Sequence, residues 1–280
     1  IQDITRKLNK TERLVAKCGR ILRMAKDPKD YFIDQKRNFK LLRGSFPFQM
    51  MSKKTKLIIM SSGTPTTSLI CKNFTRIEAP HSIPVPQRRV FYTPVGKMSK
   101  DNQDKTIPLM AKRILEIHKT YPKNTIVHTH SYGLVDKFRP YMKQSYVLFQ
   151  EKDMREEALE QFLEADECIW FSVGYGEGLN LEGKKFQRNV IAKVPYPGLG
   201  DEWVQKRNQS DEEKMGINLW YRIQTLVNIQ QASSRCTRGP KDYSEAYILD
   251  SNFGFFYKQN RKFFENWFKQ ALVFGDKCEA

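Results

Sequence analysis

The sequence predicts an α/β fold with a mainly parallel sheet flanked by helices. Two observations lead to this prediction. From Lys56 onward, short apolar runs are followed by glycine-rich or polar turns and then by amphipathic segments, which is the pattern of strands alternating with helices. The chain also has 280 residues, of which 40% are hydrophobic, so its apolar content is ample for a large core.

Residues 1 to about 45 predict a separate segment that is helical and very basic. Its basic residues from Arg6 to Lys26 surround an apolar line formed by Leu14, Cys18, Ile21 and Leu22. The Asp27-Pro28 pair then interrupts the pattern. We interpret residues 1–45 as the end of a preceding domain and residues 46–280 as the α/β domain; a helix on the path of a nucleic acid is the alternative.

Seven strands are expected, at residues 56–62, 88–94, 124–131, 145–150, 167–173, 188–194 and 245–250. Helices are expected at residues 106–120, 134–143, 155–165, 201–214 and 219–235. Aromatic residues at helical spacing near the end are interpreted as core anchors, with a base-stacking platform as the alternative: Phe256, Phe263, Phe264, Trp267 and Phe268. In open α/β sheets the functional turns follow the carboxyl ends of the strands, so chemistry is expected there.

The charge balance predicts an anionic partner. Lys and Arg number 48 against 31 Asp and Glu, which gives a net charge of +17 and a pI near 9.6. Nucleic acid is the leading candidate. A membrane surface is less favoured, because the basic residues are spread over the whole chain and no lipid-modification signal appears at the visible termini. No stretch approaches the ~20 apolar residues of a membrane span.

Cysteine usage predicts a reducing setting. The five cysteines are widely spaced, odd in number and form no CxxC pair. We therefore expect unpaired thiols in an intracellular protein, either cytoplasmic or nucleoid-associated, and no metal site within this chain.

Two turns suit contact with a nucleic acid. After the run LIIM, the hydroxyls and glycine of Ser62, Gly63 and Thr64 suit contact with a phosphate backbone, although hydroxyl-rich turns are also common helix caps. After the run TIVHT, His130, Ser131 and Tyr132 combine an imidazole, a hydroxyl and an aromatic ring, which suits backbone contact and base stacking. The alternative is that Ser131 caps the next helix and Tyr132 packs. His128 and His130 alternate on the expected strand, but no third ligand is near, so they do not predict a metal site.

The most informative turn is GYGEGLNLEG, Gly174 to Gly183. Its glycines allow close backbone approach to a ligand, while polar side chains among them reach a ribose or orient their neighbours. No GxxxxGK[ST] sequence occurs anywhere in the chain, so the chain does not supply the usual phosphate cradle and magnesium site by itself.

A third group of polar residues is expected on the helix at 219–235. Gln231, Arg235 and Arg238 stand at i, i+4 and i+7 and would share one side of a helix that Gly239-Pro240 stops. Two guanidiniums on a rigid element suit the grip of phosphate oxygens, and a solvated polar face is the alternative.

Taken in order, these motifs resemble those of one helicase family. SSGTP, IVHTHSY, SVGYGEGLNLEG and QASSRCTRGPKDY, the last followed by AYILDSNF, resemble motifs III, IV, V and VI of the second RecA-like motor domain of XPD/DinG-family superfamily 2 helicases. The resemblance covers about residues 46–260. Two positions depart from it: Asn180 stands where the family usually has Asp, and Ser234 where it usually has Gly.

The resemblance implies a function and a set of roles. It implies the C-terminal motor half of an ATP-dependent helicase or translocase that acts 5′→3′ on single-stranded nucleic acid, which we expect to be DNA. ATP and Mg²⁺ would be held mainly by a first RecA-like domain that these residues do not include. The same resemblance leaves open whether an iron–sulfur cluster belongs to the full protein. A non-catalytic nucleic-acid-binding module with a RecA-like shape is the alternative.

Site residues are carried over by the same resemblance. Arg235 and Arg238 would be arginine fingers, and Gln231 would help to position the nucleotide. In motif V, Gly178 and Asn180 would face the nucleotide or its ribose, and Glu177 would help to couple that site to the nucleic acid. The turns containing Ser62 to Thr64 and His130 to Tyr132 would line the nucleic-acid track.

Overall fold

The computed structural model describes residues 11–15, 19, 31–35, 39–41, 75, 77–78, 81–174, 181, 186–237 and 239–275. The chain divides into two compact units, one built from Ile1–Ile70 and Pro197–Tyr221 and the other from Cys71–Tyr196 and Arg222–Ala280. Several predicted features lie outside the described residues: the strand at 56–62, Ser62, Gly63, Thr64, Glu177, Gly178, Asn180 and Arg238.

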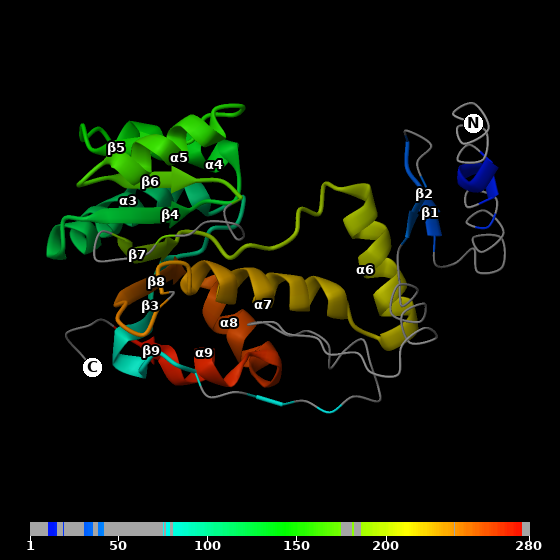
Figure 1. Cartoon of the computed structure of the whole chain (residues 1–280). Helices are drawn as coiled ribbons and strands as arrows, with labels where there is room; N and C mark the ends of the chain where they lie inside the picture. Colours follow the sequence, from blue (N-terminus) through cyan, green and yellow to red (C-terminus); the bar gives the residue numbers. More distant parts are fainter. Residues whose placement is uncertain are drawn as a thin grey trace, which may run out of the picture. The chain divides into compact units, whose positions relative to one another are not determined.

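A seven-stranded sheet forms the larger unit (Figure 1). Its strand order is β5-β6-β4-β7-β8-β3-β9, and every neighbouring pair is parallel. The strands are β3 (Arg88–Gly96), β4 (Asn124–His128), β5 (Val147–Phe149), β6 (Ile169–Ser172), β7 (Phe186–Ile191), β8 (Ser244–Asp250) and β9 (Leu272–Phe274). The predicted α/β fold with a mainly parallel sheet is therefore confirmed.

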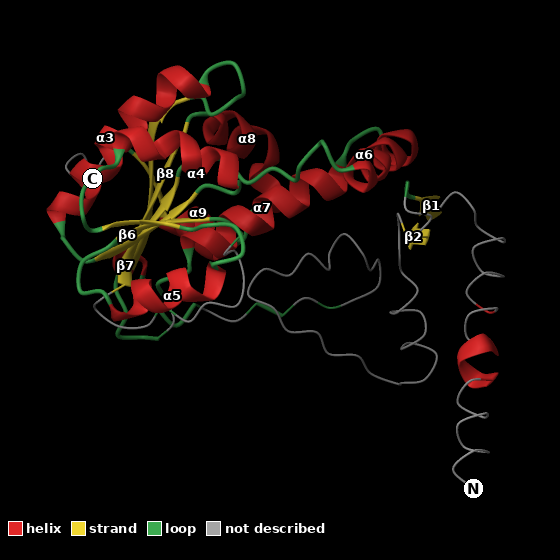
Figure 2. Cartoon of the chain, turned by 90° about the horizontal axis from the view of Figure 1, so that it is seen from above, coloured by secondary structure: helices red, strands yellow, loops and turns green. Residues whose placement is uncertain are grey.

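Helices flank this sheet (Figure 2). The helices associated with it are α3 (Gln103–Thr120), α4 (Tyr132–Phe138), α5 (Arg155–Glu164), α7 (Leu219–Ser233), α8 (Asn252–Asn260) and α9 (Asn266–Ala271), with 3-10 turns at Val85–Gln87, Arg139–Tyr141 and Arg261–Phe263. β4, β6 and β8 are buried along their whole length, and each was recognisable in the sequence by a short apolar run, at residues 126–127, 169–171 and 246–249.

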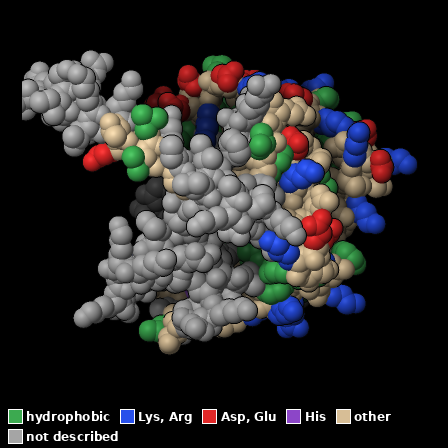
Figure 3. Space-filling model, turned by 90° about the vertical axis from the view of Figure 1, so that its right-hand side faces the viewer, with side chains coloured by type: hydrophobic (Ala, Val, Ile, Leu, Met, Phe, Trp, Pro, Cys, Tyr) green, Lys and Arg blue, Asp and Glu red, His purple; other side chains and the backbone are tan. Residues whose placement is uncertain are grey.

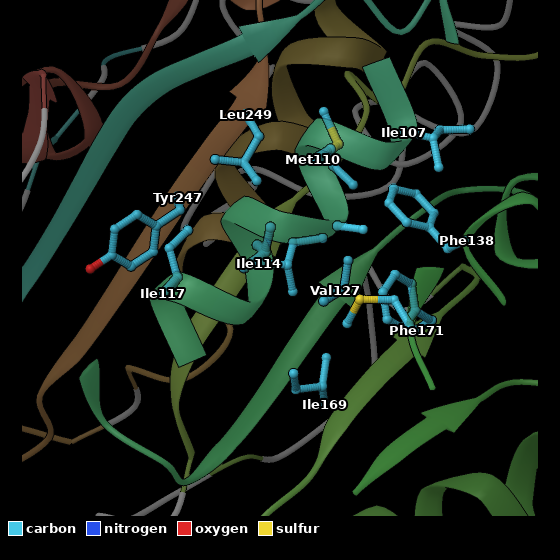
Figure 4. Packing of buried hydrophobic residues seen from close by; sticks show 14 of the residues in the cluster. Ile107, Met110, Ile114, Ile117, Val127, Phe138, Ile169, Phe171, Tyr247 and Leu249 are labelled. Atoms are coloured by element: carbon cyan, nitrogen blue, oxygen red, sulfur yellow. The ribbon is translucent and has the colours of Figure 1, made fainter. Parts of the chain in front are cut away.

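The core lies on both faces of the sheet. On one face, α3 and α4 pack against β4, β6 and β8, where Ile114 and Phe138 meet Val127 and Phe171 (Figure 4). On the other face, α5 packs around Trp170, and α7, α8 and α9 bury a cluster of aliphatic and aromatic side chains. This double cover fixes the strand ends, and with them the turns in which chemistry was expected.

The aromatic tail contributes to that second face. Phe256, Phe264 and Phe268 are buried, and Phe263 and Trp267 pack against them partly buried, so their interpretation as core anchors is confirmed. The helical spacing agrees with α8 and α9, but the sequence did not predict the short strand β9, which pairs with β3. Three residues of β9 are too few for a period of two to be recognised.

The smaller unit departs from one prediction. Residues 11–15 are helical, as expected. However, β1 (Tyr31–Ile33) and β2 (Phe39–Leu41) form an antiparallel pair, so the prediction of helix up to residue 45 is wrong for these segments. Both are rich in aromatic and branched apolar side chains, which fit a pleated surface better than a helix.

The helix predicted at 201–214 belongs to the same unit and is confirmed as α6 (Glu202–Met215). Asp201 caps its start by accepting hydrogen bonds from the amides of Trp203 and Val204 at 2.8 and 3.2 Å. Gly216 ends it with a φ of 69°, a left-handed conformation that favours glycine.

Candidate nucleotide and nucleic-acid interface

Asp250, the last residue of β8, holds together three turns at the carboxyl edge of the sheet. Its Oδ1 atom accepts hydrogen bonds from the amides of Met98 at 3.1 Å and Asn252 at 3.0 Å, and its Oδ2 atom accepts one from Val194 at 2.9 Å. Burial raises the pKa of Asp250, and these backbone donors act in the opposite direction. One buried carboxylate thus fixes the turns that follow β3, β7 and β8.

The loop after β4 carries the residues expected to contact a nucleic acid. Ser131 caps α4, because its Oγ atom accepts a hydrogen bond from the Leu134 amide at 3.3 Å. Tyr132 is partly buried, and its hydroxyl accepts a hydrogen bond from Nε2 of Gln150 at 3.2 Å. The interpretation of Ser131 as a helix cap is therefore confirmed. The bond from Leu134 uses one of the two lone pairs of the Ser131 hydroxyl and leaves its other hydrogen-bonding positions open.

Gln150 connects this loop with the glycine turn and was missed in the sequence. Its Oε1 atom accepts hydrogen bonds from the Val173 amide at 2.8 Å and from Oγ of Ser172 at 3.3 Å, and its side chain is buried. Gly174 follows with a φ of 81°, so the glycine turn begins in the left-handed region. A single Gln after a three-residue strand gave no signal in the sequence.

His128 and His130 do not lie on one strand, contrary to the prediction. β4 ends at His128, and His130 has a φ of 63°, which turns the chain out of the strand direction. The two rings nevertheless stack, with centroids 6.4 Å apart and an interplanar angle of 24°. The two rings are therefore neighbours because of the left-handed conformation of His130, and not because they alternate along one strand.

Both imidazoles are neutral at physiological pH. Burial lowers the pKa of His128 to about 3, electrostatic interactions with His130 and Arg235 lower it further, and a hydrogen bond with Asn189 on β7 opposes this shift. Burial and the charge of Lys193 lower the pKa of His130 to about 4. Arg235 and Lys193 therefore lie near the two histidines, at the ends of β4 and β7.

The end of α7 carries the residues expected to reach a phosphate. Gln231 lies in the last turn of the helix, but α7 ends at Ser233, and Arg235 lies in the following turn, where its amide donates to the Ala232 carbonyl at 3.4 Å. The prediction that one helix carries these residues up to Gly239 is therefore wrong. The hydroxyl of Ser233 bonds to the Gln230 carbonyl at 3.0 Å, and such local bonds compete with helix continuation.

Arg235 is buried in the turn that follows α7. It is 5% exposed, and the thiol of its neighbour Cys236 donates to Oδ1 of Asn189 at 3.4 Å. The Oε1 atom of Gln231 is buried and has no hydrogen-bond partner among the described residues. A buried guanidinium and a buried amide oxygen without a described partner are groups that fit a polyanionic ligand with hydroxyl or water donors.

Neither a metal site nor a membrane span is found in the described part of the chain. No group of three or more His, Cys, Asp and Glu side chains there has the arrangement of metal ligands. No helix within the same residues is long and apolar enough to cross a bilayer. On the face seen in Figure 3, the described Lys and Arg side chains are scattered among acidic and apolar ones.

Comparison with known proteins decides the family. A family model described as the helicase C-terminal domain matches residues 114–271, which is more than half of the chain. The chain belongs to the helicase C-terminal domain family. The matched residues run from the middle of α3 to the end of α9, and so include the turns after β4, β6 and β7 and the end of α7.

Relatives of this helicase C-terminal domain agree with that assignment. The regulator of telomere elongation helicase 1 homolog of Drosophila ananassae is 23% identical over 248 residues, which cover 73% of this chain and 25% of the relative. The solved structure of S. tokodaii Xpd4 has a TM-score of 0.56 and 20% identity over 85% of this chain and 49% of its own. A structure named XPD_APO has a TM-score of 0.54 and 23% identity over 68% of this chain and 40% of its own.

These matches show an XPD-type, RecA-like fold. The chain spans about a quarter of the length of the curated relative. It is thus similar to the C-terminal helicase domain of proteins that contain further regions.

Proposed function

We propose that this chain is the C-terminal motor half of an ATP-dependent helicase or translocase that moves 5′→3′ along single-stranded DNA. The observation that carries the proposal is the buried Arg235 in the turn after α7, within the residues that match the helicase C-terminal domain. A buried positive charge whose position is set before the reaction would stabilise the charge that develops in phosphoryl transfer without reorganisation at the moment of reaction.

ATP and Mg²⁺ would be bound mainly by a first RecA-like domain, and the nucleotide would supply the phosphoryl group that is transferred to water. Arg235 and Arg238 would place positive charge at its terminal phosphate, and Gln231 would position the nucleotide through its unsatisfied amide oxygen. The motif V residues Glu177, Gly178 and Asn180 would contact the ribose or orient the nucleotide. This chain would thus supply part of the nucleotide site, and the first RecA-like domain would supply the rest.

The nucleic-acid track would run over the turns that carry Ser62, Gly63 and Thr64 and over the loop of His130, Ser131 and Tyr132. Tyr132 is partly exposed, so part of its ring is available to stack on a base. Ser131 already caps α4 through one lone pair and would contact a phosphate through its hydroxyl proton. The net charge of +17 supports an anionic partner.

The same charge favours a second candidate, a nucleic-acid-binding module without motor activity. The two candidates differ in what precedes this chain in the full-length protein. A GK[ST] loop and an Asp-Glu pair on a later strand would indicate a first motor domain, and the absence of both would favour the binding module. We further propose that residues 1–45 belong to a preceding domain, that residues 46–280 form the motor domain, and that the protein is intracellular.

A strand-displacement assay tests the motor proposal. Full-length protein is given ATP, Mg²⁺ and duplexes that carry a single-stranded tail at either the 5′ or the 3′ end. We expect displacement with the 5′ tail and none with the 3′ tail, and no ATP hydrolysis by the 280-residue chain alone. Hydrolysis by this chain alone that survives both Arg235→Ala and Arg238→Ala would refute the half-motor proposal.

A further inference from the structure

His128 lies between the loop after β4 and the turn that contains Arg235. It is 2% exposed, and its strand partner in the register of β4 and β7 is Ile191. Asn189 pairs with Ile126 in the same register, so the side chains of Asn189 and His128 are diagonal neighbours on one face of the sheet. This is the face that α5 and α7 cover.

On one side, His128 contacts the loop expected to bind nucleic acid. Its ring stacks on that of His130 at 6.4 Å. His130 has a φ of 63°, in the left-handed region, a conformation that costs energy for a residue other than glycine. A change in the conformation of His130 would therefore move the ring that packs against His128.

On the other side, the connection runs through Asn189 to the turn after α7. Asn189 is fully buried, and its Oδ1 atom accepts the hydrogen bond from the thiol of Cys236, the residue that follows Arg235. The positive charge of Arg235 also acts on His128. Contacts thus extend from His130 through His128 and Asn189 to the residue beside the proposed arginine finger.

Two polar atoms at the centre of this line of contacts from His130 to Cys236 lack a described hydrogen-bond partner. Nε2 of His128 and Nδ2 of Asn189 are both buried, and neither has a hydrogen-bond partner among the described residues. A neutral imidazole with its proton on Nδ1 accepts at Nε2, and an amide Nδ2 donates, so the two atoms are a complementary acceptor and donor. A ligand that moves this donor and acceptor together would favour a second arrangement of these residues.

We propose that His128 is a positioning residue through which the loop after β4 and the turn containing Arg235 respond to each other. The inference rests on the proposed function, in which that loop contacts single-stranded nucleic acid and Arg235 contacts the nucleotide. Nucleic acid that displaces His130 shifts His128 toward Asn189, and Asn189 moves the Cys236 turn. The consequence is that hydrolysis is faster when nucleic acid is bound.

The test measures ATP turnover by the full-length protein with and without a single-stranded oligonucleotide. His128→Phe keeps a ring that stacks and removes both nitrogens. We expect the stimulated-to-unstimulated ratio to fall about tenfold, with the oligonucleotide Kd and the KM for ATP within about twofold of wild type, because the variant alters coupling and no direct contact. His118→Phe is the matched control, because His118 is also buried but bonds Thr125 and Glu167 at 3.0 and 3.1 Å. It should lower the Tm and leave the ratio unchanged.

An unchanged ratio in folded His128→Phe would overturn the inference and leave the proposed function intact. If wild type shows no oligonucleotide-stimulated turnover at all, the proposed function fails, and the inference fails with it. If His128→Phe does not fold, Cys236→Ala interrupts the same line at its other end by removing the thiol that bonds Asn189. The ratio should then fall in Cys236→Ala, and an unchanged ratio in that variant would overturn the inference.

Discussion

The Oδ2 atom of Asp250 accepts a hydrogen bond from the backbone amide of Val194 at 2.9 Å, so the end of β8 holds the turn that follows β7. Asp250→Asn would replace one acceptor oxygen with an amide donor while the three backbone donors remain in place. We expect a loss of about 2–3 kcal/mol in the free energy of unfolding, measured by urea denaturation. Asp136→Asn, at an exposed ion pair with Arg139, should change it by less than about 1 kcal/mol. Equal effects of the two substitutions would contradict the role given to Asp250.

The opposite edge of the sheet contains a buried ion pair. Arg188 lies 3.3 Å from Glu245, whose carboxylate also accepts hydrogen bonds from Tyr243 at 2.6 Å and Tyr247 at 2.7 Å. Glu245→Leu should destabilise the fold by about 3–5 kcal/mol, because it leaves a buried guanidinium without its counter-charge. Arg188→Met/Glu245→Leu should cost less than the sum of the two single substitutions, as a double-mutant cycle would measure. Additive costs would mean that the two charges do not interact.

The sequence predicted the centre of the sheet well because its central strands are parallel and buried. The apolar residues at 126–127 in β4 and 169–171 in β6 precede turns, so both strands were recognisable without any knowledge of their neighbours. The strands β1 and β2 were not predicted. Each has only three residues, they follow a strongly basic pattern at helical spacing, and only their pairing with each other makes them strands.

The site was predicted less completely, for a related reason. Residue types after the strands pointed to His130, Ser131 and Tyr132, but the buried Gln150 that joins Tyr132 to the glycine turn depends on contacts across three strands. The stacking of His128 on His130 depends on one residue with a positive φ, which a strand pattern does not reveal. The end of α7 was placed too late because Arg235 continues the helical spacing after the helix has stopped.

Tyr132 offers a test of the proposed nucleic-acid track. Tyr132→Ala removes the ring and should weaken binding of a single-stranded oligonucleotide by about 1–3 kcal/mol, the usual contribution of one base stacked on an aromatic side chain. Tyr132→Phe keeps the ring and loses only the hydrogen bond from Gln150, so its affinity should match that of wild type. Fluorescence anisotropy of a labelled oligonucleotide would measure both. Equal affinities for all three proteins would exclude stacking on Tyr132.

The buried histidines predict a dependence of stability on pH. The folded pKa values of His128 and His130 are about 3 and 4, below the ordinary value of 6.5, so the fold favours the neutral rings. Their contribution is therefore fully present above pH 6.5 and is lost as the pH falls toward 4 and then 3, at up to about 1.4 kcal/mol per pH unit for each ring.

His128→Gln removes one of these titrations. Urea denaturation at pH 7 and pH 5 should show that the variant loses less stability between the two pH values than wild type does, even if it is less stable at pH 7. Equal losses would show that His128 is not held neutral by the fold.

Arg235 and Arg238 carry the central claim, that this chain completes a nucleotide site built mainly by another domain. The most direct measurement is single-turnover ATP hydrolysis by the full-length protein with Arg235→Ala or Arg238→Ala, with Arg261→Ala as the control at an exposed arginine. Hydrolysis should fall by roughly 10³-fold or more in either of the first two variants, with the Tm and oligonucleotide binding retained, and should be unchanged in the control. Hydrolysis that stays within about threefold of wild type in both Arg235→Ala and Arg238→Ala would mean that this chain does not complete the nucleotide site.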